Sequence, residues 1–146
     1  MLVIKISGDA PGKLAAASGK LRDLTPAMRA IGAFELGATL KTFGSEGRPN
    51  KWPALAESTA AYKAKKKKTK MLMMSGMLRR SMTVKAGSRK VDIGSSLPYS
   101  AIHQFGGDAG RGHKSKIPAR PYLVVLDEDI AVINKIMGDY VRGALA

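Results

Sequence analysis

Long helical patterns occupy the two ends of this 146-residue chain, and their placement limits the possible folds more than any other feature. From residue 11 to residue 43, apolar side chains recur at helical spacing, which predicts one long or bent helix. Thr25 is the expected N-cap of its second part, with Pro26 at the first helical position, and Gly44 is placed to end it. A chain of this length forms one domain, so this helix is expected to supply much of a single core.

The second helical pattern begins at Asp127. Asp127, Glu128 and Asp129 suit the first turn of a helix, because the helix dipole is positive there. Consecutive helix residues point in different directions, so these three acids are not expected to bind a metal. Apolar residues at helical spacing predict the buried face of this helix: Leu126, Ile130, Ile133, Met137, Tyr140 and Val141.

Only short elements fit between the two main helices. The alternating residues Thr83–Lys85 and Val91–Ile93 predict a β-hairpin, and Met1–Ile6 is predicted to be a further strand. Three short helices are also expected: Pro53–Tyr62, Met77–Arg80 and Tyr99–Phe105. The predicted fold class is therefore α+β, a single domain over residues 1–146. In it, a small antiparallel β-sheet packs against a long N-terminal helix and a C-terminal helix, with extended loops.

Basic residues are concentrated in the middle of the chain. The formal net charge is +14, and residues 41–90 hold fourteen Lys or Arg against the two acids Glu46 and Glu57, which places +12 of it there. Six lysines form a predicted exposed, mobile arm at about residues 63–70: Lys63, Lys65, Lys66, Lys67, Lys68 and Lys70. Together with Arg79 and Arg80, the arm either is a solvated surface or faces DNA or an acidic partner. Aromatic residues make up 5% of the chain and do not interleave with the basic ones, so a platform for stacking bases is not expected.

No motif fits a catalytic or cofactor site. The glycine-rich segment at about residues 107–116 resembles a phosphate-binding loop, but His113 separates Gly112 from Lys114 where such a loop needs them adjacent. His103 and His113 are the only histidines and cysteine is absent, which makes a weak case for zinc. We therefore expect no enzyme, no cofactor and no metal, and we expect residues 107–116 to form a flexible loop. No apolar run approaches the ~18 residues of a membrane-spanning helix.

Two rigid features lie outside the helices. Pro118 and Pro121 bracket Arg120 in an extended strip, which serves either as a stiff connector into the last helix or as an inter-subunit contact made by Arg120. Trp52, the only tryptophan, is expected to pin its loop to the body of the domain or to a neighbour.

The order of these segments is more specific than any one of them. Gly47-x-Pro49-x-x-Trp52 comes first, then Ser75-Gly76-x-Leu78-x-x-Ser81, then the segment Tyr99–Gly106, then Ile117–Tyr122 and the last helix. This succession, over roughly residues 40–145, resembles the phage virion morphogenesis or tail-completion family of Mu-like, contractile-tailed bacteriophages. It is also similar, more distantly, to the neck proteins of other long-tailed phages.

The resemblance implies a structural virion protein at the head–tail neck, either a tail terminator or a head–tail connector, assembled in the host bacterial cytoplasm. It implies a homo-oligomeric ring, with a hexamer favoured over a dodecamer, that contacts neighbouring neck, adaptor, tail-tube or sheath proteins and touches genomic DNA loosely. It implies no catalytic residues and no membrane. The matching positions would be folding or subunit-interface residues: Trp52, Tyr99, His103, Phe105, Gly106, Pro118, Arg120 and Pro121. The lysine arm is not part of the resemblance, and the alternative is a sequence-independent nucleic-acid-binding protein acting through that arm.

Overall fold

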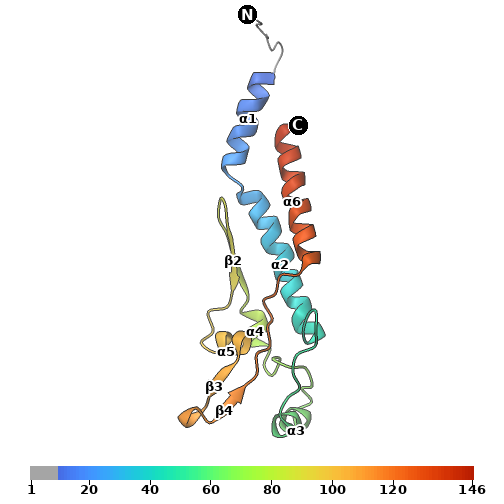
Figure 1. Ribbon diagram of the computed structural model, residues 1–146, viewed down its shortest axis with the longest axis vertical. Helices are drawn as coiled ribbons and strands as arrows, with labels where there is room; N and C mark the ends of the chain where they lie inside the picture. The colour runs from blue at the N-terminus through green and yellow to red at the C-terminus, as the bar shows by residue number, and fades with distance from the viewer. Residues whose placement is uncertain (1–9) are drawn as a thin grey trace, which may run out of the picture.

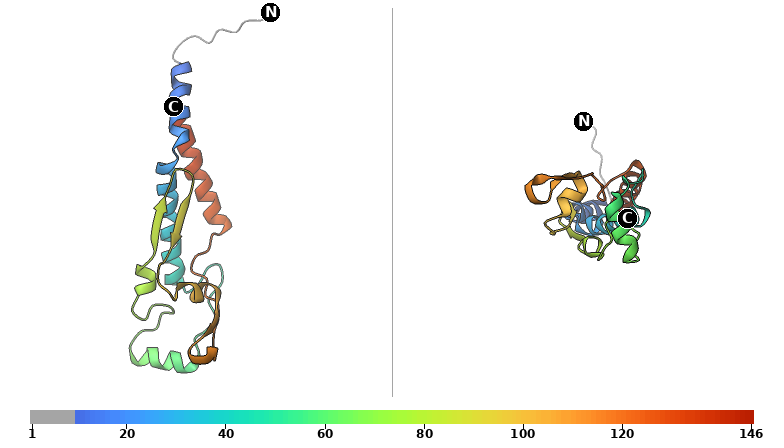
Figure 2. Two further views of the ribbon diagram at one scale, coloured as in Figure 1. Left: turned by 90° about the vertical axis from the view of Figure 1, so that its left-hand side faces the viewer. Right: turned by 90° about the horizontal axis from the view of Figure 1, so that it is seen from below.

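The computed structural model describes residues 10–146 and shows an elongated molecule, with a helical rod at one end and shorter elements at the other (Figure 1, Figure 2). Helices α1 (Ala10–Arg22) and α2 (Thr25–Ser45) follow one another along the rod. Helix α6 (Asp127–Leu145) runs antiparallel beside them and packs on both. The two predicted main helices are therefore confirmed, and the N-terminal one is interrupted. The strand expected at Met1–Ile6 lies outside the described residues.

The interruption between α1 and α2 is held by side chains from both main helical segments. The Asp23 carboxylate accepts hydrogen bonds from the backbone N–H and the hydroxyl of Thr25, at 2.9 and 2.5 Å. The N-cap residue is Leu24, so the predicted N-cap Thr25 is wrong by one residue; Thr25 is the first residue of α2 and donates to Asp23. From α6, the Tyr140 hydroxyl lies 3.1 Å from the carbonyl oxygen of Lys20 and 2.9 Å from that of Asp23. It satisfies carbonyls that the end of α1 leaves open.

Helix α2 also ends later than predicted. It continues through Gly44 to Ser45, and Glu46 takes the left-handed conformation with φ 58°. The backbone N–H groups of Glu46 and Gly47 then bond back to the carbonyls of Phe43 and Thr42, at 3.4 and 3.0 Å. These bonds close the last turn, so a non-glycine residue fills the position that the sequence pattern assigned to glycine.

The predicted β-hairpin is confirmed as β1 (Thr83–Ala86) paired antiparallel with β2 (Val91–Gly94), and it lies along α2 (Figure 1). Gly32 makes this close packing possible. A Cβ atom at Gly32 would lie 2.4 Å from Cγ1 of Val84 and 2.9 Å from Cγ2 of Val91. Glycine lowers helix propensity by about 1 kcal/mol relative to alanine, and here the cost is offset by contact between helix and hairpin.

The other end of the molecule carries the remaining elements: α3 (Glu57–Lys65), α4 (Met77–Arg80), α5 (Ser100–Phe105), β3 (Gly107–Ala109), the 3₁₀ turn η1 (Arg111–His113) and β4 (Ser115–Ile117). The helix at α4 is as predicted, α5 begins one residue late, and α3 is shifted into the lysine-rich segment. Where a flexible loop was expected at residues 107–116, β3 and β4 pair as a second antiparallel hairpin; whether this segment is flexible stays a prediction. Gly110 and Gly112, with φ 78° and 72°, provide its turn. The fold class is α+β as predicted, with two separate hairpins in place of one sheet.

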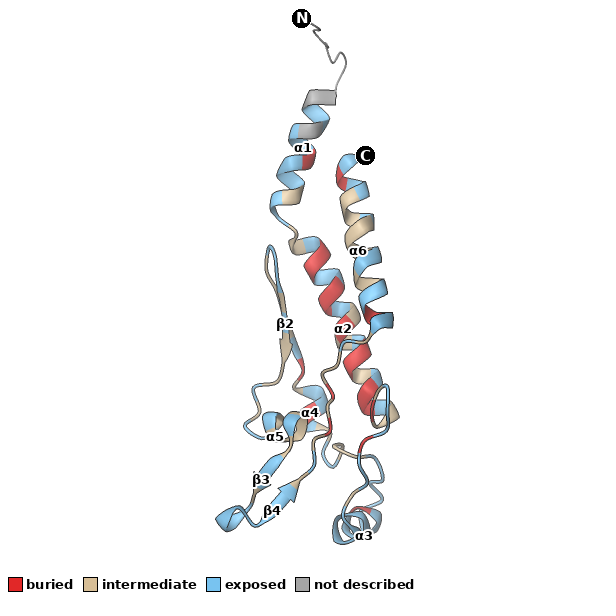
Figure 3. Cartoon of the chain, viewed as in Figure 1, coloured by how far each residue is buried: buried red, intermediate tan, exposed pale blue. Residues whose placement is uncertain are grey.

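A core cluster of buried residues lies where α2 ends. It consists of Phe43, Trp52, Leu78, Met82 and Tyr122. The ring of Phe43 stacks on that of Tyr122 at a centroid distance of 5.1 Å and meets that of Trp52 edge-on at 6.0 Å. Figure 3 shows buried residues along α2 and around this cluster, whereas β3, β4 and most of α3 are exposed. None of the helices in residues 10–146 is long and apolar enough to cross a lipid bilayer.

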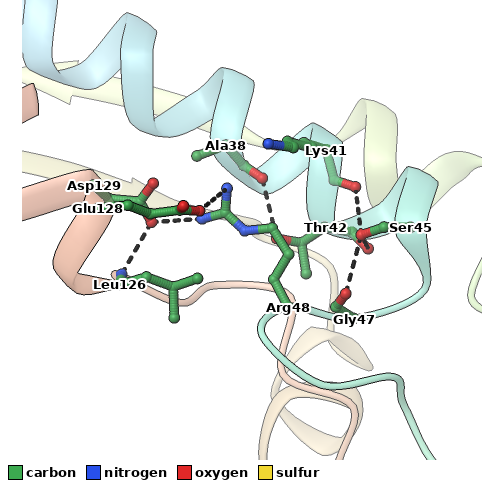
Figure 4. A network of polar contacts seen from close by, with 9 residues as sticks. All are labelled: Ala38, Lys41, Thr42, Ser45, Gly47, Arg48, Leu126, Glu128 and Asp129. Carbon is green, nitrogen blue, oxygen red and sulfur yellow. Dashed lines mark hydrogen bonds and ion pairs between the residues drawn. The ribbon is translucent and has the colours of Figure 1, made fainter.

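A buried ion pair fixes the start of α6 to the loop after α2 (Figure 4). Arg48 Nη2 lies 2.5 Å from Asp129 Oδ2, and the two side chains are 9% and 4% exposed. The same carboxylate oxygen accepts the backbone N–H of Leu126 at 2.9 Å. Asp129 therefore caps the helix as well as pairing with Arg48.

The apolar face of α6 is less covered than its pattern predicted. Asp129 and Ala144 are its buried residues, and Ile130 is 45% exposed. Ile133, Met137, Tyr140 and Val141 are partly buried. The prediction of a buried Ile130 is therefore wrong.

Candidate functional site

The segment from Pro118 to Pro121 is tied to the loop around Trp52. The indole Nε1–H of Trp52 donates to the carbonyl oxygen of Pro121 at 2.8 Å. Arg120 is 6% exposed, and its Nε and Nη2 donate to the carbonyl oxygens of Pro53 and Ala54 at 3.1 and 2.9 Å. Trp52 and Arg120 thus join two segments nearly 70 residues apart in the sequence, and the polar ends of both side chains bond within the chain.

Helix α5 is attached to the same segment through Gln104. Its Oε1 accepts the backbone N–H groups of Tyr122 and Leu123, both at 3.0 Å, and its Nε2 donates to the carbonyl of Leu123 at 2.9 Å. The Tyr122 hydroxyl donates to the carbonyl of Ser100 at 3.0 Å. The sequence did not single out Gln104, although this residue lies within the motif. A glutamine between His103 and Phe105 does not by itself indicate that its amide will form three bonds to the backbone.

Gly106 ends α5 where two backbone segments come very close. Its φ is 74°, and a Cβ atom there would lie 2.8 Å from the nitrogen of Ala119 and 2.9 Å from the carbonyl oxygen of Ile117. Any side chain would push β4 away from α5. The motif glycine is therefore required by packing.

Two aromatic motif residues, one just before α5 and one at its end, are more exposed. Phe105 is 78% exposed and Tyr99 is 40% exposed. The rings of Tyr99 and His103 meet edge-on at 5.9 Å. Burial, and secondarily the charge of Arg120, hold the pKa of His103 below its usual value, so its ring is neutral at pH 7. An uncharged, half-buried ring of this kind serves packing, whereas Phe105, Tyr99 and Pro118 are the motif residues that stay exposed.

A groove of about 660 Å³ opens between α3, residues 72–78, α5 and β4. Its walls include the exposed side chains of Tyr62, Met74 and Met77, at 55%, 37% and 50%. Lys63, Lys116 and Arg120 also line it. We call this the basic groove. Its size is within the range of about 300–1,000 Å³ that ligand pockets span.

The predicted basic arm is only partly as expected. Lys65, Lys66, Lys67, Lys68 and Lys70 are exposed, as are Arg79 and Arg80. Lys63 is 5% exposed, and burial lowers its pKa, with Glu46 partly offsetting the effect. Lys63 and Lys65 belong to α3, which brings Lys63 against the body of the domain. The exposed basic surface therefore begins at Lys65.

The glycine-rich segment differs in structure from a phosphate-binding loop. Residues 107–117 form a hairpin, whereas a phosphate-binding loop leads into a helix. Across the part of the chain that the structure describes, no group of three or more His, Asp or Glu could hold a metal ion. Together, Trp52, Gln104 and Arg120 join α5 and residues 120–123 to the loop that precedes α3.

Comparison with known proteins shows what kind of chain has these features. It is similar to the Mu-like prophage FluMu G protein 2 of Haemophilus influenzae, at 36% identity over 115 residues that cover 79% of this chain and 76% of that protein. It is also similar to the putative capsid assembly protein G of Escherichia phage Mu, at 32% identity over 101 residues that cover 65% of each. No solved structure matches the chain. The profile of one family matches residues 9–142, and the chain therefore belongs to the phage virion morphogenesis family.

Proposed function

We propose that this chain is a structural, non-enzymatic virion protein that completes the tail of a tailed phage and joins it to the head. It acts as a ring of identical copies at the neck, either as a tail terminator or as a head–tail connector. Membership of the virion morphogenesis family supports a role in particle assembly. The similarity to a putative capsid assembly protein supports the same role.

The proposal rests on one observation: a well-packed core lies beside large apolar side chains that remain exposed. The core cluster, Trp52 and Arg120 fix the elements below α2, yet large apolar side chains stay exposed on several surfaces: Phe105 at 78%, Val125 at 58%, Leu145 at 56% and Ile130 at 45%. Large apolar side chains that stay exposed on a well-packed chain are candidates for surfaces that partners cover. Different patches on different faces suit head-to-tail contacts, which close into rings.

The shape supports side-by-side packing of copies. The rod of α1, α2 and α6 is long and narrow, and the apolar face of α6 is only partly buried. Neighbouring copies aligned along their rods would bury more of that face. A hexamer is the expected ring and a dodecamer the alternative, with neck, adaptor, tail-tube or sheath proteins as its axial neighbours.

The proposal is tested by electron microscopy of lysates from a phage with a stop codon early in this gene. DNA-filled heads beside detached tails would place the protein at the junction, and abnormally long tails would assign it to tail termination. Supplying the intact gene from a plasmid should restore joined particles. Normal, infectious particles without the protein would contradict the proposal.

The alternative function, sequence-independent binding of nucleic acid, is favoured by one observation. Five exposed lysines follow closely along the end of α3 and the turn after it: Lys65, Lys66, Lys67, Lys68 and Lys70. Phosphate contacts of this kind give binding that weakens steeply with salt, with a slope of about −0.9 per neutralised phosphate. A short duplex titrated at several salt concentrations tests it. Loose contact with DNA in the neck predicts weak binding, and tight binding would favour the alternative.

A further inference from the structure

Charge sets a requirement on any ring of this chain. Each copy carries a net charge of +14, from 25 basic and 11 acidic residues, so copies placed side by side repel one another. A ring closes more readily if an acidic surface of one copy meets a basic surface of the next. The exposed acids are therefore informative about where copies touch.

The basic groove has the character of one such surface. Its lining is apolar with three basic residues, Lys63, Lys116 and Arg120, and includes no Asp or Glu. Because Arg120 already bonds two carbonyls and Lys63 is buried, Lys116, which is exposed, is the cation most available to a partner. An occupant with apolar side chains beside a carboxylate would match this lining.

A surface of that kind lies at the start of α6. Val125 is 58% exposed and Ile130 is 45% exposed. Asp127 and Glu128 lie between them in the sequence and are exposed, the Glu128 side chain at 67%. Arg48 bonds Asp129 at 2.5 Å but lies 3.8 Å from Glu128, so Glu128 keeps most of its capacity for another cation. We call Val125, Asp127, Glu128 and Ile130 the acidic corner.

We propose that the acidic corner of one copy docks in the basic groove of the next copy. The corner and the groove are formed by different elements, so the contact is head-to-tail and can repeat around a ring. Val125 and Ile130 would fill the groove beside Tyr62, Met74 and Met77, with Glu128 facing Lys116. Stable interfaces bury about 1,200–2,000 Å² in total. This contact would therefore be one part of a larger interface, and contacts between the helical rods of the two copies would supply the rest. The inference rests on the proposed ring and specifies its interface.

Cross-linking tests the pairing, because the natural chain has no cysteine. The double variant Val125→Cys with Met77→Cys places one thiol on the corner and one in the groove. In particles complemented with this variant, a short thiol-specific cross-linker should give a ladder of oligomers on a denaturing gel. The single variants and a mismatched pair, Val125→Cys with Lys85→Cys, should give no ladder. The particles must contain the protein for this test. The pairing would then be overturned if only monomers appeared on the gel. It would also be overturned by dimers without larger species, which is the result that a two-fold contact would give.

A charge exchange provides a second test at exposed positions. Glu128→Lys alone and Lys116→Glu alone should each reduce plaque formation by the complemented phage, and the two together should restore it. Circular dichroism of the purified variants should show unchanged folding. If the double variant is no better than the singles, the pairing is wrong even though the protein is in the neck. If particles lack the protein altogether, the proposed function fails and this interface with it.

Discussion

Replacing Arg48 with methionine should destabilise the fold strongly. The guanidinium lies 2.5 Å from Asp129, and both side chains are at least 91% buried, so solvent screens the pair little. Removing one member of a buried ion pair leaves the other charge without a partner and costs about 3–5 kcal/mol. For a chain of this size, each kcal/mol lowers the melting temperature by about 2–4 °C, so the expected fall is on the order of 10 °C. Urea unfolding followed by circular dichroism measures the change.

The same substitution should make stability more dependent on pH. Glu35 is 6% exposed, and its pKa is raised by burial and then by the charge of Asp129, while Arg48 lowers it. Without Arg48, the two carboxylates lose their shared cation, and the pKa of Glu35 should rise further. A carboxyl whose pKa is raised by folding stabilises the protein below its unfolded pKa, and this stability is lost as the pH rises through the folded pKa. The deficit of Arg48→Met should therefore be smaller near pH 4.5 than near pH 7.5.

Lys135→Met provides the matched control. It removes an ion pair with Asp139 of similar length, 2.7 Å, whose side chains are 74% and 51% exposed. Solvent screening makes such pairs contribute little, so this variant should unfold nearly as the natural chain does. Equal losses in the two variants, or a deficit in Arg48→Met that does not change with pH, would refute the reasoning from burial.

Four further substitutions test single features of the fold. Trp52→Phe leaves the buried carbonyl of Pro121 without its donor and should cost about 1–3 kcal/mol in a thermal melt. Gly106→Ala, at φ 74° and against backbone atoms, should cost more than about 1 kcal/mol, whereas Gly143→Ala, with no atom within 4 Å, should stabilise the helix by about 0.5–1 kcal/mol. Glu35→Gln should raise the free energy of unfolding near pH 7 and change it little near pH 4. The reason is that the raised pKa of Glu35 makes its charged form unfavourable in the folded state. An equal gain at both pH values would show that charge is not the cause.

Patterns of local origin were predictable from the sequence. Helical spacing predicted both main helices, and alternating residues predicted the β1–β2 hairpin. The order of motifs indicated the family, which the match over residues 9–142 confirms. Errors arose where glycine suggested irregular backbone. Gly44 lies inside α2. Gly107 lies in β3, and Gly110 and Gly112 form the turn of a hairpin whose polar and basic residues show no strand pattern.

Contacts between distant segments could not be predicted. Arg48 and Asp129 are 81 residues apart in the sequence. Because an acidic residue is favourable at the start of a helix, Asp129 gave no reason to expect an ion-pair partner. Lys63 looked like the first residue of an exposed run, and only the position of α3 buries it. The role of Arg120 had two interpretations, connector or interface, and its bonds to Pro53 and Ala54 show that its guanidinium is used within the chain.

Folding and assembly place different demands on neighbouring residues of one motif. Lys116 is exposed on the rim of the basic groove, while Arg120, four residues later, is buried and holds two segments together. Loss of Arg120 would lower the free energy of unfolding, so a defect in particles from such a variant would not identify an interface. Loss of the Lys116 charge should leave the free energy of unfolding unchanged. The exposed positions Lys116, Phe105 and Glu128 are therefore where an assembly defect can be separated from a folding defect, and where an interface of the proposed ring should be sought.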